Sequence, residues 1–291
     1  MLQPELDSLV PSRDYSRRDF VRTAVGSGFA AAVLPVSAQA IKTDSSGLTV
    51  GEVTIPVGDF KMPAYRAMPA GKTSLPVVLV VSEVFGVHEY IADVARRFAK
   101  AGYLAIAPEL FVRQGDAQSY GEISKLLSEV VNKVPDVQVM GDLDASVAWA
   151  KANGGDTARL GITGFCWGGR QTWLYDAHNP AVKAAVAWYG RLLGAGSPLQ
   201  PKHPMEVVGT LNGPVLGLYG GADQGIPQDQ VDKLVDTLKK SKNKSAKASD
   251  THVYPGTPHG FNADYRPSYR KDAAEDGWKR MMAWFKENGA A

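Results

Sequence analysis

The segment Arg159-Leu-Gly-Ile-Thr-Gly-Phe-Cys166-Trp-Gly-Gly-Arg170 decides the fold of this 291-residue chain. Its apolar start, residues 160–163, predicts a strand that stops at Gly164, and the residues after Gly169 are compatible with a helix. The spacing Gly-x-Cys-x-Gly is that of a nucleophile elbow, a sharp strand-to-helix turn with a reactive residue at its tip. Glycine is needed there because other side chains would collide with the nucleophile or the incoming helix. A helix beginning after Cys166 also directs N–H groups and its positive dipole end at the sulfur, which lowers a thiol pKa.

The first forty residues are typical of an export signal rather than of a folded element. Ser16-Arg-Arg-Asp-Phe-Val-Arg22 is a twin-arginine signature, residues 23–36 form an apolar run, and Ala38-Gln39-Ala40 is a small-residue cleavage site. The apolar run is too short and too rich in alanine for a membrane span. We expect a twin-arginine signal peptide at 1–40, cut after Ala40, with the twin-arginine (Tat) export machinery as partner. The mature protein would be periplasmic or secreted, without stable membrane association; a basic terminus or an uncleaved anchor is the alternative.

The composition restricts the class of protein. Residues 41–291 suit one large α/β domain with a sizeable core. A net charge of +2 without a basic stripe argues against nucleic acid as a partner. Cys166 is the single cysteine, so an internal disulfide is impossible, and a lone thiol in an oxidising compartment favours a functional use. No spacing of histidine, cysteine and acidic residues resembles a metal site, and we expect no cofactor.

Apolar runs typical of strands buried on both faces alternate with segments whose apolar residues recur at helical spacing. We expect strands at residues 47–57, 60–68, 75–82, 103–107, 160–163, 182–189, 214–221 and 252–254. We expect helices at 89–101, 137–152, 228–240 and 273–286, a loop and a helix within 109–133, a long connection at 190–213, and a solvated helix end and linker at 239–247. In the helix 137–152, Leu143, Val147 and Ala150 should point inward. This alternation predicts a doubly wound, mostly parallel sheet flanked by helices in a single domain.

Three reactive residues follow strands in separate loops: Cys166, Asp223 and His259. Sites of parallel sheets form at the carboxyl ends of strands, and the order nucleophile, acid, histidine is that of α/β-hydrolases. His259 would accept the thiol proton and return one to the leaving group, while Asp223 would fix the imidazole tautomer. Asp223 as a turn residue and His259 as a loop histidine are the alternatives.

A carboxylate also ends the strand 75–82. Glu83 could accept a hydrogen bond from the Cys166 thiol and keep it protonated at rest; its alternative is an acid at a helix N-terminus. His88 lies beside this position and its role is open. The remaining histidines are expected to be structural: His178, His203 and His252.

The chain resembles the dienelactone hydrolase family of α/β-hydrolases in motifs that span nearly all of residues 41–291. They are Ser-Glu83-Val-Phe-Gly, Ala-Pro-Glu109-Leu, Gly-Phe-Cys166-Trp-Gly-Gly, Trp-Tyr-Gly190, Gly-Gly-Ala-Asp223 and Pro-His259-Gly-Phe. The resemblance implies a triad of Cys166, Asp223 and His259. It also implies that a glutamate, Glu83, holds the thiol in its resting state until substrate displaces the thiol. It implies an oxyanion hole built from the backbone N–H groups of Trp167 and Val84. The implied activity is cofactor-free hydrolysis of dienelactone (carboxymethylenebutenolide) to maleylacetate.

The chain departs from the family where a substrate carboxylate would bind. Family members hold that carboxylate with two arginines, one shortly after the catalytic histidine and one in the middle helical section. Here Ala263 stands four residues past the histidine, and residues 120–134 contain no arginine. Arg113, Arg191 and Arg266 are the candidates for a substitute. The reaction type, cysteine attack on a lactone or ester carbonyl through a thioester intermediate, is therefore better supported than the substrate.

Three rival functions remain open. A general periplasmic carboxylesterase would share the mechanism and differ in substrate. A non-catalytic binding protein on a hydrolase fold would be expected to have lost a triad residue, and none is lost. A redox sensor would use the lone thiol without an acid and a histidine.

Overall fold

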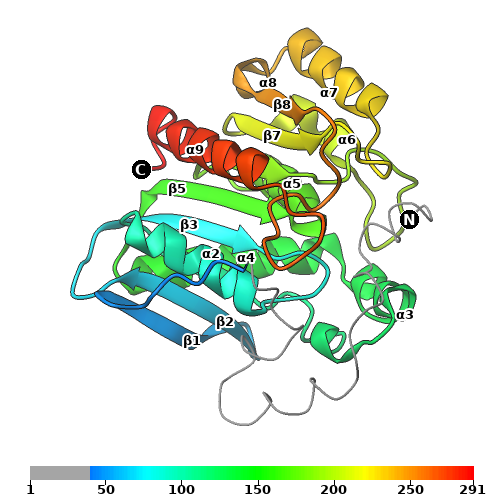
Figure 1. Ribbon diagram of the computed structural model, residues 1–291. Coiled ribbons are helices and arrows are strands. Elements are labelled where there is room, and N and C mark those ends of the chain that lie inside the picture. The colour runs from blue at the N-terminus through cyan, green and yellow to red at the C-terminus, as the bar shows by residue number, and fades with distance from the viewer. Residues whose placement is uncertain (1–39) are drawn as a thin grey trace.

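An eight-stranded sheet forms the centre of the fold in the computed structural model, which describes residues 40–291 (Figure 1). The predicted signal peptide, apart from Ala40, lies outside the described residues. The strands are β1 Leu48–Val57, β2 Phe60–Pro69, β3 Leu75–Val81, β4 Leu104–Pro108, β5 Gly155–Phe165, β6 Val182–Trp188, β7 Val215–Gly220 and β8 Asp250–Tyr254. The helices are α2 Glu89–Lys100, α3 Ile123–Glu129, α4 Asp136–Ala152, α5 Trp167–His178, α6 Pro204–Val207, α7 Gln228–Lys240, α8 Lys244–Ala248 and α9 Lys271–Glu287.

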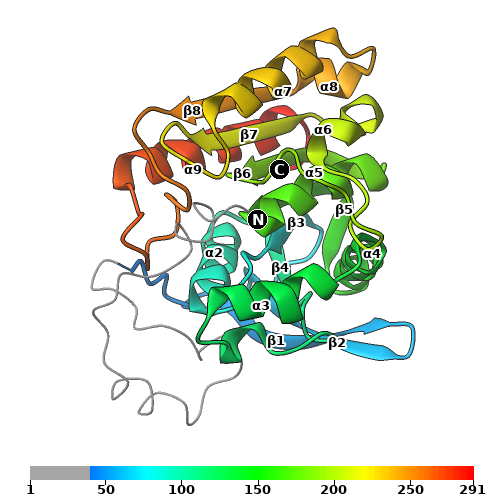
Figure 2. The ribbon, with the colours of Figure 1, turned by 90° about the vertical axis from the view of Figure 1, so that its right-hand side faces the viewer.

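The sheet has the order β1-β2-β4-β3-β5-β6-β7-β8 and is mostly parallel. Strands β3 to β8 pair in parallel, whereas β1 and β2 form an antiparallel hairpin that joins the sheet through antiparallel pairing of β2 with β4. Helices α2 and α9 cover one face and α4 and α5 cover the other (Figures 1 and 2). Every residue of β3 is buried, as expected for a strand covered on both faces. The prediction of a doubly wound, mostly parallel sheet is confirmed.

The predicted elements differ from the observed ones mainly where tertiary contacts act. The segment 239–247, expected to be a solvated linker, contains the start of α8, because Asn243 caps that helix by accepting the N–H of Ala246 at 2.9 Å. Val147 of α4, expected inward, is only half-buried, while Leu143 and Ala150 are buried.

Helix α5 approaches the neighbouring strands so closely that only glycine fits at the contacts. A Cβ on Gly168 would overlap the backbone oxygens of Val81, the last residue of β3, and of Ser82, the residue after it. A Cβ on Gly169 would lie 2.6 Å from the carbonyl oxygen of Trp188, which ends β6. The atoms that a Cβ would meet belong to the backbone, and they cannot move away as the end of a flexible side chain could. The glycines of the elbow therefore set the position of α5 against the sheet.

We predict that Gly168→Ala lowers the free energy of unfolding by roughly 2 kcal/mol or more, because α5 must move away from β3. Gly141→Ala is the matched control: this exposed glycine of α4 has open space around its Cβ position. There alanine should raise the free energy of unfolding by about 0.5–1 kcal/mol through better helix propensity. Urea denaturation followed by circular dichroism measures both. Equal effects of the two substitutions would contradict the close contact.

Candidate active site

Cys166 occupies the turn between β5 and α5 with a φ of 55° and a ψ of −113°. A positive φ is costly for a residue with a Cβ, and such strain is typical of functional turns. Its N–H donates to the carbonyl of Trp188 at 3.0 Å, and its carbonyl accepts the N–H of Arg170 at 3.2 Å. The side chain is buried at the N-terminus of α5. The structure thus contains the elbow that the glycine spacing predicts.

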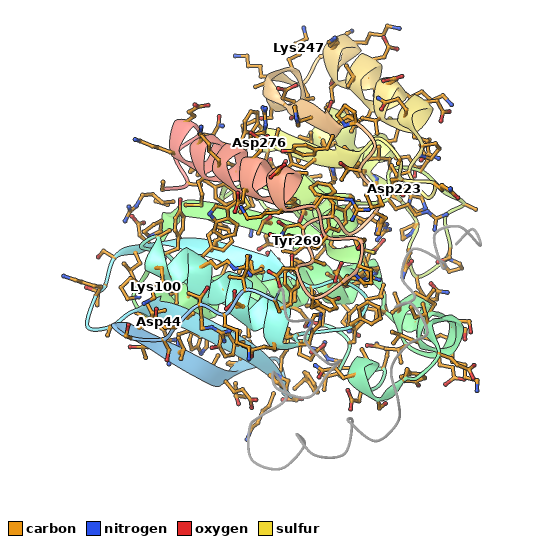
Figure 3. All side chains as sticks on the ribbon, in the orientation of Figure 1. Asp44, Lys100, Asp223, Lys247, Tyr269 and Asp276 are labelled. Atoms are coloured by element: carbon orange, nitrogen blue, oxygen red, sulfur yellow. The ribbon has the colours of Figure 1, made fainter. Side chains whose placement is uncertain are left out.

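Asp223 and His259 are hydrogen-bonded to each other beyond the carboxyl ends of β7 and β8. Figure 3 labels Asp223 in the loop that follows β7. His259 Nδ1 lies 2.7 Å from Asp223 Oδ2, and both side chains are buried. The other oxygen of Asp223, Oδ1, accepts the N–H groups of Gly225 at 2.9 Å and Ile226 at 3.2 Å, which fixes the carboxylate. Asp223 is therefore a turn residue and the partner of His259 at once.

The surroundings of His259 favour its protonated form. Burial alone would lower its pKa, but the charges of Asp223 and Cys166, and hydrogen bonds to both, raise the pKa of His259 well above its ordinary value. Its Nε2 is buried and has no nitrogen or oxygen partner among residues 40–291. Cys166 is thus the group with which His259 is placed to exchange a proton.

Cys166 and His259 line one pocket. Val84 and Trp167 line the same pocket, one from the loop after β3 and the other from the first position of α5. Neither backbone N–H donates to another backbone carbonyl in the described part of the chain. The two N–H groups expected to form the oxyanion hole therefore belong to residues on the wall of the cavity that holds the thiol.

Glu83 is buried just after β3, but its carboxylate faces the loop that follows β8. Tyr265 donates its O–H to Glu83 Oε2 at 2.7 Å, and Arg266 Nη1 lies 3.6 Å from Oε1. Within residues 40–291, Oε1 accepts no hydrogen bond, so the thiol of Cys166 does not donate to it. Tyr265 and Arg266 are thus the polar side chains that face this carboxylate. Gating by Glu83 stays a prediction.

The three candidate arginines lie in different places. Arg191 lines the pocket beside Cys166, donates its Nε to the Leu193 carbonyl at 2.8 Å and forms no ion pair with another described residue. Arg266 is buried and pairs with Glu83. Arg113 lies outside the pocket lining: its Nη1 and Nη2 donate to Asp142 at 2.6 and 2.8 Å. The structure therefore brings Arg191, and not Arg113, to the thiol.

The sequence reasoning missed six pocket residues: Val131, Asn132, Arg170, Tyr189, Gln200 and His203. Arg170 forms a bidentate pair with Asp136 at 2.7 and 2.8 Å, and its Nε lies 3.4 Å from His203 Nδ1. Its position four residues after Cys166, on the same face of α5, could have identified it. His203, expected to be structural, comes from the irregular segment 190–213, which gave no such signal.

The other histidines lie outside this pocket. His88 is buried between aromatic rings, with ring centroids 4.9 Å from Tyr265, and burial lowers the pKa of His88 to about 4. His178 pairs with Asp144 on the surface at 2.8 Å. Residues 40–291 contain no group of three or more acidic, histidine or cysteine side chains that could hold a metal ion. No helix in that range is long and apolar enough to cross a membrane.

Comparison with known proteins places the chain in a family. The model of the dienelactone hydrolase family matches residues 62–289. A protein of Methylorubrum extorquens, provisionally named a carboxymethylenebutenolidase, is 58% identical over 289 residues, which cover 99% of this chain and 98% of that protein. A protein of Escherichia coli strain K12 with the same provisional name is 53% identical and covers 92% of this chain and 97% of its own length.

Solved structures give the same result. The crystal structure of a provisionally named dienelactone hydrolase from Klebsiella pneumoniae aligns with a TM-score of 0.79 at 54% identity, over 82% of this chain and 98% of that one. The dienelactone hydrolase-like phosphotriesterase P91 from metagenomic libraries aligns with a TM-score of 0.67 at 20% identity, which shows the shared fold alone. By sequence and by fold, this chain belongs to the dienelactone hydrolase family of α/β-hydrolases and is an ester or lactone hydrolase.

Proposed function

We propose that this protein is a cysteine-dependent hydrolase of a small lactone, dienelactone, which it opens to maleylacetate. The observation that carries the proposal is the shared pocket of Cys166 and His259, with Asp223 bonded to the far side of the imidazole at 2.7 Å. A thiol, a base and an orienting carboxylate in this relation are what nucleophilic acyl transfer requires.

The proposed reaction has two steps. His259 takes the proton of Cys166, and the sulfur attacks the lactone carbonyl while the N–H groups of Val84 and Trp167 stabilise the oxyanion. The ring C–O bond then breaks, His259 gives its proton to the departing oxygen, and a thioester remains. His259 next removes a proton from a water molecule, which attacks the thioester, and the carboxylic acid leaves as the thiolate of Cys166 is expelled. Asp223 keeps Nδ1 protonated throughout, so that Nε2 is the base.

The charge in the pocket supports an acidic substrate. Arg170 is neutralised by Asp136, whereas Arg191 lines the pocket without an ion-pair partner among the described residues. A guanidinium binds a carboxylate with good geometry, and the benefit grows where water is partly excluded. Arg191 is therefore the residue that we assign to the carboxylate of dienelactone.

The proposal includes export of the protein by its N-terminal signal peptide. The twin-arginine signature and the small-residue site before Ile41 would direct the folded protein through the Tat machinery to the periplasm. Mass spectrometry of the periplasmic fraction should then find an N-terminus at Ile41, and replacing Arg17 and Arg18 by lysine should keep the protein in the cytoplasm. An intact N-terminus after export would refute cleavage.

Cys166→Ala should lower kcat/KM for dienelactone at least about 1,000-fold, because no other group is placed to form the thioester. His259→Ala should have an effect of similar order. His178→Ala, which changes a surface histidine paired with Asp144, is the matched control and should keep full activity. The assay is ultraviolet absorbance of the lactone. Retained turnover in folded Cys166→Ala would refute the proposal.

Arg191→Met should lower kcat/KM for dienelactone roughly 10- to 100-fold, because a charge-assisted hydrogen bond to the substrate carboxylate is lost. Hydrolysis of neutral phenyl acetate should change less than about twofold. Arg113→Met is the matched control, since Arg113 pairs with Asp142 outside the pocket and should not alter the ratio of the two activities. A wild-type enzyme that prefers neutral esters would instead identify a general carboxylesterase.

A further inference from the structure

A second buried carboxyl group, that of Glu109, contacts the loop that carries Val84. Glu109 follows the last residue of β4, and its Oε1 is buried without a hydrogen-bond partner among the described residues. It does not line the pocket of Cys166. It lies against the loop between β3 and α2, at Gly86 and Val87.

The carboxyl group of Glu109 fixes this loop by direct contacts. Val87 N–H donates to Glu109 Oε2 at 2.7 Å, and the backbone N–H of Phe111 forms a second hydrogen bond to the carboxyl group. Gly86, with a φ of 74°, lies so close that a Cβ there would come within 2.7 Å of Oε2. The loop thus rests on the carboxylate with its backbone, and an ordinary side chain at position 86 would separate the two.

The same loop determines where Val84 lies. The N–H of Gly86 donates to the carbonyl of Glu83 at 3.4 Å, which closes a turn around Val84. Beyond it, Gln118 donates to the Val87 carbonyl at 3.1 Å. Between β3 and α2, the backbone around Val84 is therefore held by Glu109 at one end and by the strand at the other.

We propose that Glu109 is a positioning residue of the hydrolysis, whose carboxylate holds Gly86 and Val87 and thereby places the Val84 N–H in the oxyanion hole. This inference rests on the proposed function, because it acts through the oxyanion hole assigned there. A carboxylate accepts an N–H bond about twice as strongly as a neutral acceptor, so the charge of Glu109 is part of its role.

That charge depends on pH near neutrality. Burial raises the pKa of Glu109 to about 7, against the hydrogen bonds from Val87 and Phe111, and Asp116 raises it further. The loop 83–88 presents backbone N–H groups to Glu109, and the segment after β4 presents the N–H of Phe111 and the carboxylate of Asp116. The hydrogen bonds from the loop to Glu109 therefore strengthen as pH rises through about 7, because the carboxyl group loses its proton.

The contribution of Glu109 to the stability of the folded protein should fall over the pH range in which its contact with the loop strengthens. The pKa of Glu109 in the folded state, about 7, lies above its ordinary 4.5, so between these pH values the folded protein retains a proton that the unfolded chain has lost. The unfolded state binds fewer protons there, and the contribution of Glu109 to stability falls as pH rises. A purely structural carboxylate would have no reason to combine this loss of stability with higher activity.

Glu109→Gln tests the assignment, because the amide keeps the shape and one acceptor but cannot ionise. We expect kcat/KM at pH 8 to fall roughly three- to tenfold, and the ionisation near pH 7 to disappear from the pH profile of kcat/KM. We also expect the melting temperature at pH 8 to rise. The measurements are steady-state kinetics from pH 5 to 9 and calorimetry on the full chain.

Asp176→Asn is the matched control. Asp176 is a buried carboxylate of α5 that accepts the N–H groups of Asn212 and Gly213, each at 3.1 Å, and burial raises its pKa to about 8. Its loss should alter the melting temperature and leave the kinetic pH profile unchanged. An unchanged profile in Glu109→Gln, or the same kinetic change in Asp176→Asn, would overturn the role of Glu109. Failure of the proposed function would appear separately, as turnover by Cys166→Ala.

Discussion

The active site depends on the close backbone contact between helix α5 and the carboxyl ends of the central strands. Gly168 lies against β3 and Gly169 against β6, with no room for a side chain on either. This contact brings the start of α5 up to the edge of the sheet and forces the turn before it to be abrupt. Cys166 therefore takes a positive φ, and Cys166 and Trp167 line the same cavity. The strain at the nucleophile is balanced by packing that extends over three strands.

A second constraint is that the charges around this turn are buried and so must be paired. A buried charge without a partner costs several kcal/mol, roughly 3–5 when one partner is removed. Asp223 meets His259, Arg170 meets Asp136, and Glu83 meets Arg266. Each pair joins segments far apart in the sequence, so the pairs also fix the loops relative to one another. Arg191, which is only half-buried, can keep its charge in the pocket without an internal partner and remains available to a ligand.

Most of the fold could be predicted from the sequence because the strands are buried on both faces. A run such as β3, apolar at every position, can only be the interior of a covered sheet, and the glycines around Cys166 admit few other turns. The errors arose where tertiary contacts override local pattern. Helix α8 is too short for periodicity and depends on the cap from Asn243. Val147 has the spacing of an inward residue but lies at the margin of the buried face of α4.

Some residues of the candidate site could likewise be predicted from the sequence, and others could not. Cys166, Asp223 and His259 could be found because each follows a strand, and parallel strands deliver their carboxyl ends to one edge. The partners of Glu83 could not, since Tyr265 and Arg266 lie in a loop whose path is set by its packing on α2 and not by any repeat. His203 and Arg191 belong to the irregular segment 190–213 for the same reason. The part of the candidate site that lies at strand ends therefore follows from the regular pattern of the sheet, whereas the side chains that surround it come from loops whose paths depend on tertiary packing.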